Sequence, residues 1–334
     1  MNLPLVTQDL PGIGGRVKSA PEDFVVVEAP LYEPSGTGEH IYLRHRRAGS
    51  TTQDLAHRLA REFGLRPFDV GVAGLKDKIA VAEQTFSLPL PKADIEDVRT
   101  RAAAVLPGEV LWAKRHGNKL RRGHLLGNRF EALVRGVRAD ARLDAERIGL
   151  ELVRLGVPNF YGEQRLGTDG RNVEIGRAKL NDDSRDWLAN LHRTAWQADL
   201  FNVWLLERLE AGTSRTVILG DVAKRLDNGA LFDVTDAAAE VERAERLEIT
   251  PSGPLFGKDM RRAAHAAAEH EERILATNGI AWEALEKSRL LGSRRAARVL
   301  LAEFSCREAE EGLWISFRLS KGSYATVVLR EFAR

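Results

Sequence analysis

The chain has 334 residues and a mass of 37.1 kDa, with 43% hydrophobic and 29% charged residues, so we expect a soluble globular protein with room for two domains. Its single cysteine, Cys306, excludes an internal disulfide and a cysteine-built zinc site, and it favours a reducing, cytoplasmic setting. No stretch is typical of a secretory signal or a membrane span, so we predict a protein that is neither exported nor inserted.

The net charge of +2 hides an uneven distribution of basic residues. Within residues 114–138, where Glu131 is the only acid, the first basic cluster comprises Lys114, Arg115, Lys119, Arg121, Arg122, Arg129, Arg135 and Arg138. The second basic cluster comprises Lys287, Arg289, Arg294, Arg295 and Arg298. Such clusters are typical of proteins that neutralise nucleic-acid phosphates, although two solvated basic faces would have the same composition.

The first predicted strand follows a proline-initiated turn at Pro21. The β-branched run after it places Phe24, Val26 and Glu28 on one face and Val25 and Val27 on the other. A face that combines a phenylalanine with a glutamate is also typical of an edge strand, so this pattern leaves a structural role open.

Alternating strands and helices are predicted as far as Gly156. We expect strands at 40–44, 68–72, 84–88, 110–114 and 130–134, and helices from the 50–54 capping segment to about Phe63, at 94–106 and at 140–155. The glycines at 117, 123 and 127 divide the first basic cluster into turns.

The composition changes after Gly156, where we place a domain boundary. Helices are predicted at 186–210, 259–277 and 282–290, with a loop at 251–257 between two of them. The strand pattern returns from about Ala296, with strands at 299–304 and 313–319, and the turn at 321–324 leads into 325–329 within this strand-rich segment. We therefore predict one sheet domain interrupted by an insertion, a topology that brings Tyr324 back near the N-terminal sheet.

One carboxylate, Asp77, lies between Lys76 and Lys78, after Gly74 and before the predicted strand at 84–88. A loop between two strands holds a side chain on a rigid scaffold and still exposes it, as a catalytic group requires. An ordinary solvated turn has the same composition, so this stretch alone leaves both interpretations open.

Phe130 lies within the first basic cluster. An exposed phenylalanine there would suit base stacking, which contributes about 1–3 kcal/mol per base, although a core phenylalanine is the more frequent outcome. The histidines form no metal-binding set, and no Ser/His/Asp spacing is present.

Five blocks resemble the TruD family of tRNA pseudouridine synthases, in the family's order. They are Lys18 with Pro-Glu-Asp-Phe at 21–24, Ala-Gly-Leu-Lys-Asp at 73–77 with Ala80 and Gln84, Gly-Asn-Arg-Phe at 127–130, Asn-Phe-Tyr-Gly-Glu-Gln-Arg at 159–165, and Lys-Gly-Ser-Tyr-Ala-Thr at 321–326. The resemblance runs from about Lys18 to Phe332. Two positions depart from the pattern: Ala82 stands where Thr is expected and Leu166 where Phe is usual, and both affect packing more than chemistry.

The resemblance implies an α+β fold in which a mixed β-sheet core flanked by helices is interrupted by a largely helical, family-specific insertion. The catalytic domain would comprise 1–154 and 303–334, and the insertion domain 155–302. The implied reaction is the isomerisation of uridine 13 in transfer RNA to pseudouridine. Because no electrons or groups leave, we expect no cofactor and no metal, and we expect a monomer acting on tRNA, with other structured RNAs left open.

The resemblance also implies roles for individual residues. Asp77 would be the catalytic aspartate, Phe24 and Asn128 would contact the target nucleotide, and Tyr324 would lie over the site. Lys18, Glu28 and Phe130 match further active-site positions, with Phe130 at the stacking place. The phosphates would then be held by Lys114, Arg115, Lys119, Arg121 and Arg122.

Several points stay open at this stage. Asp77 could attack the sugar or the base or take a proton, and its cationic partner could be Lys18 or Arg165 as well as a neighbouring lysine. The target nucleotide must leave the stack and enter a pocket. The alternatives are a non-catalytic RNA-binding protein and a metal-dependent RNA-processing enzyme, and the second would need clustered carboxylates or histidines.

Overall fold

The computed structural model describes residues 3–76, 78–180, 184, 186–288 and 290–334. The chain forms two compact units. The large-sheet unit comprises Pro11–Gly149, Ala302–Gly322 and Phe332–Arg334. The small-sheet unit comprises Met1–Leu10, Leu150–Leu301 and Ser323–Glu331.

The large-sheet unit is built on a mixed sheet that has nine strands among the described residues, with the main order β14-β15-β7-β2-β5-β3-β6 and with β1 beside β7 and β4 beside β5. Only the β2–β5 pair is parallel in the recorded pairings. The strands are β1 (Arg16–Val17), β2 (Phe24–Pro30), β3 (His40–Arg47), β4 (Gly71–Val72), β5 (Val81–Pro89), β6 (Glu109–His116), β7 (Leu125–Arg135), β14 (Ala302–Ala309) and β15 (Gly312–Ser320). The α+β prediction of a mixed sheet with flanking helices is confirmed.

Strand β2 is an inner strand of this sheet. Val26 is paired with Phe130 on β7 and with Ala82 on β5. Phe24, Val26 and Glu28 are buried and the residues between them are half-buried, so the predicted division into two faces is confirmed. The edge-strand interpretation is wrong because β2 has hydrogen-bonded neighbours on both sides.

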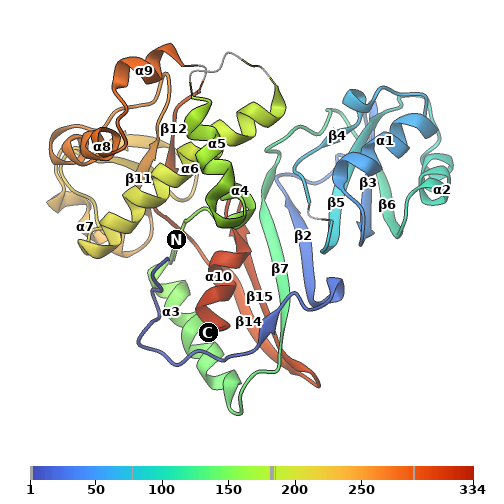
Figure 1. Ribbon diagram of the computed structural model, residues 1–334. Coiled ribbons are helices and arrows are strands. Elements are labelled where there is room, and N and C mark those ends of the chain that lie inside the picture. Colours follow the sequence, from blue (N-terminus) through green and yellow to red (C-terminus); the bar gives the residue numbers. More distant parts are fainter. Residues whose placement is uncertain (1–2, 77, 181–183, 185, 289) are drawn as a thin grey trace. The chain divides into compact units, whose positions relative to one another are not determined.

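Helices α1 (Thr52–Glu62) and α2 (Ile95–Val105) cover β3, β5 and β6 in this unit (Figure 1). The side chain of Thr51 caps α1 by accepting a hydrogen bond from Asp54 N. Leu55 and Leu59 of α1 are fully buried against Leu43 and its neighbours on the sheet, and burying a leucine stabilises the fold by about 1.5–3 kcal/mol. The third helix, α3 (Ala141–Leu155), begins in this unit.

The strand predicted at 68–72 is largely wrong. Pro67–Asp69 forms a 3-10 helix, and only Gly71–Val72 pairs as β4. The Asp69 carboxylate accepts hydrogen bonds from the backbone and guanidinium of Arg66, which closes a turn where the sequence pattern favoured extension. Phe68 is consequently 81% exposed.

The small-sheet unit combines a four-stranded antiparallel sheet, in the order β10-β9-β11-β12, with a two-stranded pair and several helices. The strands are β8 (Val157–Pro158), β9 (Val222–Arg225), β10 (Leu231–Asp233), β11 (Ile249–Leu255), β12 (Ser293–Ala296) and β13 (Arg298–Val299). The helices are α4 (Glu163–Leu166), α5 (Arg171–Ala178), α6 (Trp187–Glu210), α7 (Val241–Glu245), α8 (His265–Thr277), α9 (Trp282–Lys287) and α10 (Ala325–Phe332). Helix α6 packs against α5, α8 and β11. Neither α6 nor any other helix in the described ranges is long and apolar enough to cross a membrane.

The loop predicted at 251–257 is wrong, because most of it belongs to β11, an inner strand of the small sheet. The prolines of β11 have no N–H to donate, but their carbonyl oxygens can accept hydrogen bonds. Pro251 O, for example, accepts one from Ala297 N at 2.9 Å. Gly253 lies so close to Trp204 of α6 that a Cβ would come within 2.3 Å of the indole ring. The glycine therefore reflects close packing of a helix on a strand and not a turn.

Residues 325–329 form the start of α10 instead of continuing the strand pattern. The Thr-Val-Val run favours a strand by propensity, but Ala325, Val328, Leu329 and Phe332 are buried at helical spacing. Near its end, Glu331 accepts hydrogen bonds from the backbone of Val6 and Thr7 at 3.1 Å, which ties the N-terminal segment to this helix.

Candidate functional site

Three polar side chains meet at the centre of the large sheet. Glu28 on β2 is paired with Asn128 on β7, and Lys76 reaches both from the segment between β4 and β5. Lys76 Nζ lies 2.9 Å from Glu28 Oε2 and donates to Asn128 Oδ1 at 2.7 Å. Lys76 and Glu28 are only 8% and 2% exposed. We call Glu28, Lys76 and Asn128 the polar triad.

The electrostatics of the polar triad depend on burial. Burial lowers the pKa of Lys76, and the ion pair with Glu28 opposes that shift. Glu28 Oε1 also accepts from Thr85 N at 3.2 Å, so its carboxylate lies between β2 and β5. A buried pair of this kind is stable only when its remaining hydrogen bonds are made, and here a backbone amide and an asparagine supply them.

The backbone at Lys76 is held by Thr52, which is in turn bonded to Gln84. The sequence placed Thr52 in a helix cap and Gln84 in a block of family resemblance. Lys76 N donates to Thr52 Oγ1 at 2.9 Å, and that hydroxyl donates to Gln84 Oε1 at 2.9 Å. Nothing in the sequence indicated this role for Thr52, because a threonine directly after the N-cap residue is expected to belong to the cap. Its hydroxyl links the start of α1 to the segment that carries the triad lysine.

The two polar side-chain atoms of Asn128 differ in their hydrogen bonds. Its Oδ1 is taken up by the ammonium of Lys76, which also fixes the orientation of the amide. Within the described residues no hydrogen bond is made by its Nδ2. Asn128 Nδ2 can therefore donate to a carbonyl oxygen, and the expectation that Asn128 offers both a donor and an acceptor stays a prediction.

Asp77, the predicted catalytic residue, lies outside the described residues. The chain on either side of it is defined: Lys76 is buried in the polar triad and Lys78 is exposed. Lys78 O accepts from Gly49 N at 3.0 Å, just after β3. The two flanking residues are thus attached to different parts of the large-sheet unit.

A row of three side chains in the large-sheet unit begins at Lys18, continues through Phe24 and ends at Phe130. Lys18 Nζ lies 4.1 Å from the centroid of the Phe24 ring, which stacks on Phe130 with 5.9 Å between centroids. Phe130 also contacts Phe317 of β15. Phe24 and Phe130 are 5% and 7% exposed, so both rings contribute to the core and present only small surfaces to solvent.

The turn before β2 is held by an ion pair. Asp23 accepts from Ala20 N at 2.8 Å and from Arg135 of β7 at 2.8 and 2.7 Å. The hydrogen bonds from Arg135 lower the pKa of Asp23 despite its burial. Lys18 has a φ of 57°, a left-handed conformation that is rare for a lysine, and it precedes this fixed turn.

Tyr324 belongs to the small-sheet unit, where it meets Tyr161 edge to face with 5.7 Å between ring centroids. The guanidinium of Arg295 lies 3.9 Å from the Tyr161 ring centroid and donates to Asn159 Oδ1 at 2.6 Å. Burial raises the pKa of Tyr324, and the positive charges of Arg165 and Arg295 oppose that shift. The expectation that Tyr324 lies near the N-terminal sheet stays a prediction.

The first basic cluster contains residues in two different situations. Lys114, Arg121 and Arg122 are exposed. Arg115 donates to Ala93 O at 2.5 Å, and Lys119 donates to Phe68 O at 2.5 Å, so both are already engaged within the protein. The exposed members are therefore better placed than the engaged ones to meet a polyanion.

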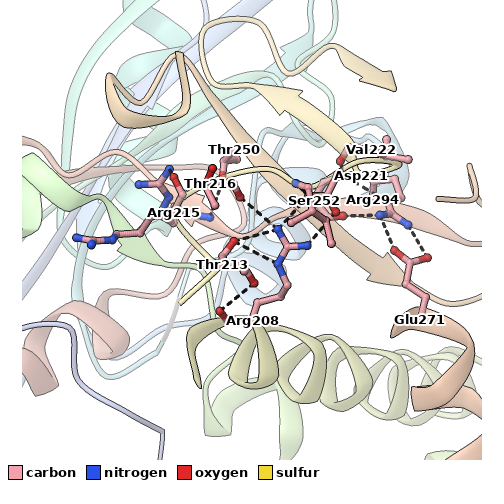
Figure 2. Close-up of polar contacts among 12 residues, drawn as sticks. Arg208, Thr213, Arg215, Thr216, Asp221, Val222, Thr250, Ser252, Glu271 and Arg294 are labelled. Carbon is pink, nitrogen blue, oxygen red and sulfur yellow. Dashed lines mark hydrogen bonds and ion pairs between the residues drawn. The ribbon is translucent and has the colours of Figure 1, made fainter. Parts of the chain in front are cut away.

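Among the described members of the second basic cluster, Lys287 is exposed, whereas the arginines are engaged inside the protein. Arg294 and Arg298 are 5% and 4% exposed. Arg294 pairs with Glu271 at 2.7 Å and contacts Ser252, as Figure 2 shows. Arg298 donates to backbone carbonyls, among them Leu155 O at 2.9 Å. Arg289 lies outside the described residues. Charge spacing predicted a surface, but buried acceptors elsewhere in the unit accommodate these guanidiniums.

A family model described as "tRNA pseudouridine synthase D (TruD)" matches residues 1–191 and 184–332. The tRNA pseudouridine synthase D of Anaeromyxobacter sp. (strain Fw109-5) is 45% identical over 345 residues, covering 99% of this chain and 96% of that protein. A protein of the same name from Thermus thermophilus is 43% identical over 331 residues, covering 98% of this chain and 91% of that protein.

The fold has a solved counterpart. The crystal structure of the putative tRNA pseudouridine synthase D (TruD) from Methanosarcina mazei matches with a TM-score of 0.75 and 22% sequence identity, covering 99% of this chain and 96% of that one. At this identity the likeness concerns the fold alone, which is the α+β fold described above.

Proposed function

The chain belongs to the TruD family of tRNA pseudouridine synthases, and from that premise we propose that it isomerises uridine 13 of transfer RNA to pseudouridine, with Asp77 as the essential residue. The family match extends over nearly the whole chain, and the relatives are covered almost completely. The observation that carries the site is the polar triad: Lys76, the residue directly before Asp77, is buried and joined to β2 and β7.

The proposed reaction requires few catalytic groups. The bond between C1′ of the ribose and N1 of uracil breaks, the base turns, C5 bonds to C1′ and releases its proton, and N1 takes up a proton. No electrons or atoms are exchanged with a co-reactant, so no cofactor is needed. One ionised carboxylate suffices as nucleophile or base, and Asp77 fills that role in the proposal.

The target base has to leave the helical stack before this chemistry is possible. In the proposal, Asn128 Nδ2 donates to a uracil carbonyl, because its Oδ1 is held by Lys76. Phe24 and Phe130 wall the pocket beside the ammonium of Lys18, and Tyr324 is a further substrate-binding residue of the proposal. The phosphates are held by the first basic cluster, chiefly by its exposed members Arg121 and Arg122.

The remaining parts of the proposal concern the whole molecule. Residues 1–154 and 303–334 form the catalytic domain, and 155–302 form the insertion domain of the family. The protein acts as a monomer in the cytoplasm, on tRNA, with other structured RNAs left open as substrates.

The decisive experiment compares the wild-type chain with Asp77→Asn on tRNA transcripts labelled with tritium at C5 of uridine. We expect the variant to bind tRNA nearly as well as the wild type and to release no tritium, because an amide neither attacks nor accepts a proton at neutral pH. Asp97→Asn, an exposed change on α2, serves as the matched control and should release tritium normally.

A second tRNA transcript tests whether position 13 is the one that is modified. A transcript in which uridine 13 is replaced by cytidine should release no tritium with the wild-type chain. Release from that transcript would overturn the assignment of position 13, and full turnover by Asp77→Asn would overturn the assignment of the aspartate. A wild-type chain that binds tRNA but converts no uridine would instead favour the non-catalytic RNA-binding alternative.

A further inference from the structure

A cavity of about 190 Å³ lies in the large-sheet unit, on the face of the sheet that α1 and α2 do not cover. Leu43 and Phe86 point towards those helices, and because side chains alternate along a strand, Arg44 and Thr85 point to the other face. Both line the cavity. The Glu28 carboxylate, inserted between β2 and β5, borders it as well, so the cavity and the polar triad share one residue.

The floor of the cavity holds the carboxylate of Glu83 beside the buried guanidinium of Arg44. Arg44 is 6% exposed and spends its donors on Glu83 Oε1 at 2.7 Å, Thr85 Oγ1 at 3.3 Å and the carbonyl of Glu28 at 2.8 Å. The carboxylate of Glu83 is 21% exposed, and no described residue donates to its Oε2. A ligand would therefore meet a carboxylate oxygen that accepts, beside an arginine each of whose three nitrogens already donates one hydrogen bond.

The walls of the cavity are aromatic. Trp112 stands opposite Arg44 on the neighbouring strand. Tyr32 and His124 face one another across a 2.8 Å hydrogen bond between Oη and Nδ1, and His116 stacks on Tyr32 with 5.0 Å between ring centroids. Flat walls of this kind suit a planar heterocycle, which gains stacking energy from them.

The size and the rim of the cavity indicate what the heterocycle belongs to. At roughly 30 Å³ per water the volume equals about six waters, which is the scale of one base. Leu120 and His124 line the cavity and enclose the exposed Arg121 and Arg122 in the chain. Lys114 Nζ lies 5.2 Å from the Trp112 ring centroid. Phosphates on either side of a bound base would thus meet cations.

We propose that this cavity binds one unstacked base of the tRNA that carries an exocyclic amino group, namely adenine, cytosine or guanine, and so holds a nucleotide other than the target uridine. The amino group donates to Glu83, and Trp112 and Tyr32 enclose the ring. Uracil is disfavoured because its one ring donor, N3–H, lies between two carbonyl oxygens, which would approach the Glu83 carboxylate together with it. The inference rests on the proposed function in that the ligand is tRNA.

The first test is the steady-state kinetics of Glu83→Gln. We expect KM for tRNA to rise about tenfold, the scale of one lost hydrogen bond to a charged group, while kcat stays within about twofold. Glu109→Gln, at an exposed position on β6 outside the cavity, should change neither constant. Because Glu83 pairs with Arg44, a thermal melt of both variants confirms that they are folded.

The second test observes the cavity directly. The full chain is labelled with 5-fluorotryptophan, and the Trp112 resonance is identified by its absence from Trp112→Phe. Titration with AMP, CMP, GMP and UMP should shift this resonance with at least one amino-bearing nucleotide and not with UMP, and Glu83→Gln should abolish the shift.

The outcomes separate this inference from the proposed function. A Trp112 resonance that responds equally to UMP, or that responds to none of the four nucleotides, overturns the cavity assignment. If Glu83→Gln and Glu109→Gln have equal KM values for tRNA, the cavity assignment is also overturned. In that case wild-type turnover would still support the synthase activity. Absence of wild-type turnover together with a selective Trp112 shift would instead remove the proposed function and leave the cavity as a base-binding site.

Discussion

Lys76 Nζ and Glu28 Oε2 lie 2.9 Å apart, with both side chains almost completely removed from solvent. The two residues are far apart in the chain, so their contact fixes the segment before Asp77 to an inner strand of the large sheet. Removing one member of a buried pair leaves the other charge without compensation, which makes the pair indispensable once it is present.

Lys76→Met should therefore damage both stability and turnover. We expect the free energy of unfolding to fall by about 3–5 kcal/mol, because Glu28 stays buried without a counter-charge. We expect kcat/KM for tRNA to fall roughly 100-fold or more, because Asn128 loses the contact that orients its amide. Urea denaturation and tritium release measure the two effects.

Two variants separate these effects. Lys78→Met, at the exposed lysine on the other side of Asp77, should leave stability unchanged. The double change Lys76→Met with Glu28→Gln should recover much of the stability and none of the activity. Recovery of activity by the double variant would show that the pair only supports the fold.

Changing Arg121 and Arg122 together to alanine should weaken tRNA binding in a way that depends on salt. Each lost phosphate contact lowers the slope of log K against log salt by about 0.7–0.9, so the double variant should lose between about 1 and 2 units of slope. Filter binding at several salt concentrations measures it. The same changes at Arg58 and Arg61, exposed on α1, should leave the slope unaltered, and an equal loss there would contradict a local phosphate site.

The Asp23–Arg135 pair should make stability depend on pH at the acid end. Arg135 lowers the pKa of Asp23 below its ordinary value of 3.8, so the native state binds this proton less readily than the unfolded state. The stabilisation is complete above the unfolded pKa and is lost as the pH falls through the folded pKa. Asp23→Asn should thus be less stable than the wild type near neutral pH, with the difference shrinking below about pH 4 in urea titrations. A difference that stays constant with pH would contradict the pair.

Arg294→Met should affect stability and not RNA binding. The guanidinium pairs with Glu271 in the interior of the small-sheet unit, so we expect the free energy of unfolding to fall by about 3–5 kcal/mol with no change in the salt dependence of tRNA binding. Replacing Glu271 with leucine in the same chain should restore most of the loss. A reduced salt slope in Arg294→Met would revive the surface interpretation of the second basic cluster.

Local patterns predicted much of the large-sheet unit from sequence. The alternation of Phe24, Val26 and Glu28 and the cap before α1 depend on neighbouring residues, and both are present in the structure. The family resemblance implied that Asn128 contacts the target nucleotide and that Glu28 is a further active-site position, but it gave no sign that the two residues are paired.

The contacts that sequence could not supply are those set by strand register. Lys76 meets Glu28 and Asn128 only because β2, β5 and β7 are neighbours, and the sequence contains no local sign of that order. Arg294 of β12 pairs in the interior with Glu271, which comes from helix α8. The prolines and the glycine at 251–257 indicated a loop because close packing on Trp204 is not encoded locally.

The pairing of β7 with β15 also has a consequence for how the chain is made. These strands form the longest pairing in the large sheet, yet residues 136–311 separate them. During synthesis β7 therefore has an unpaired edge until the last part of the chain leaves the ribosome, and such an edge is a template for association between chains. Closing so long a loop is also slow. Early folding of the intervening small-sheet segment would shorten that exposure, so truncation near the C-terminus should cause aggregation rather than yield a smaller soluble protein.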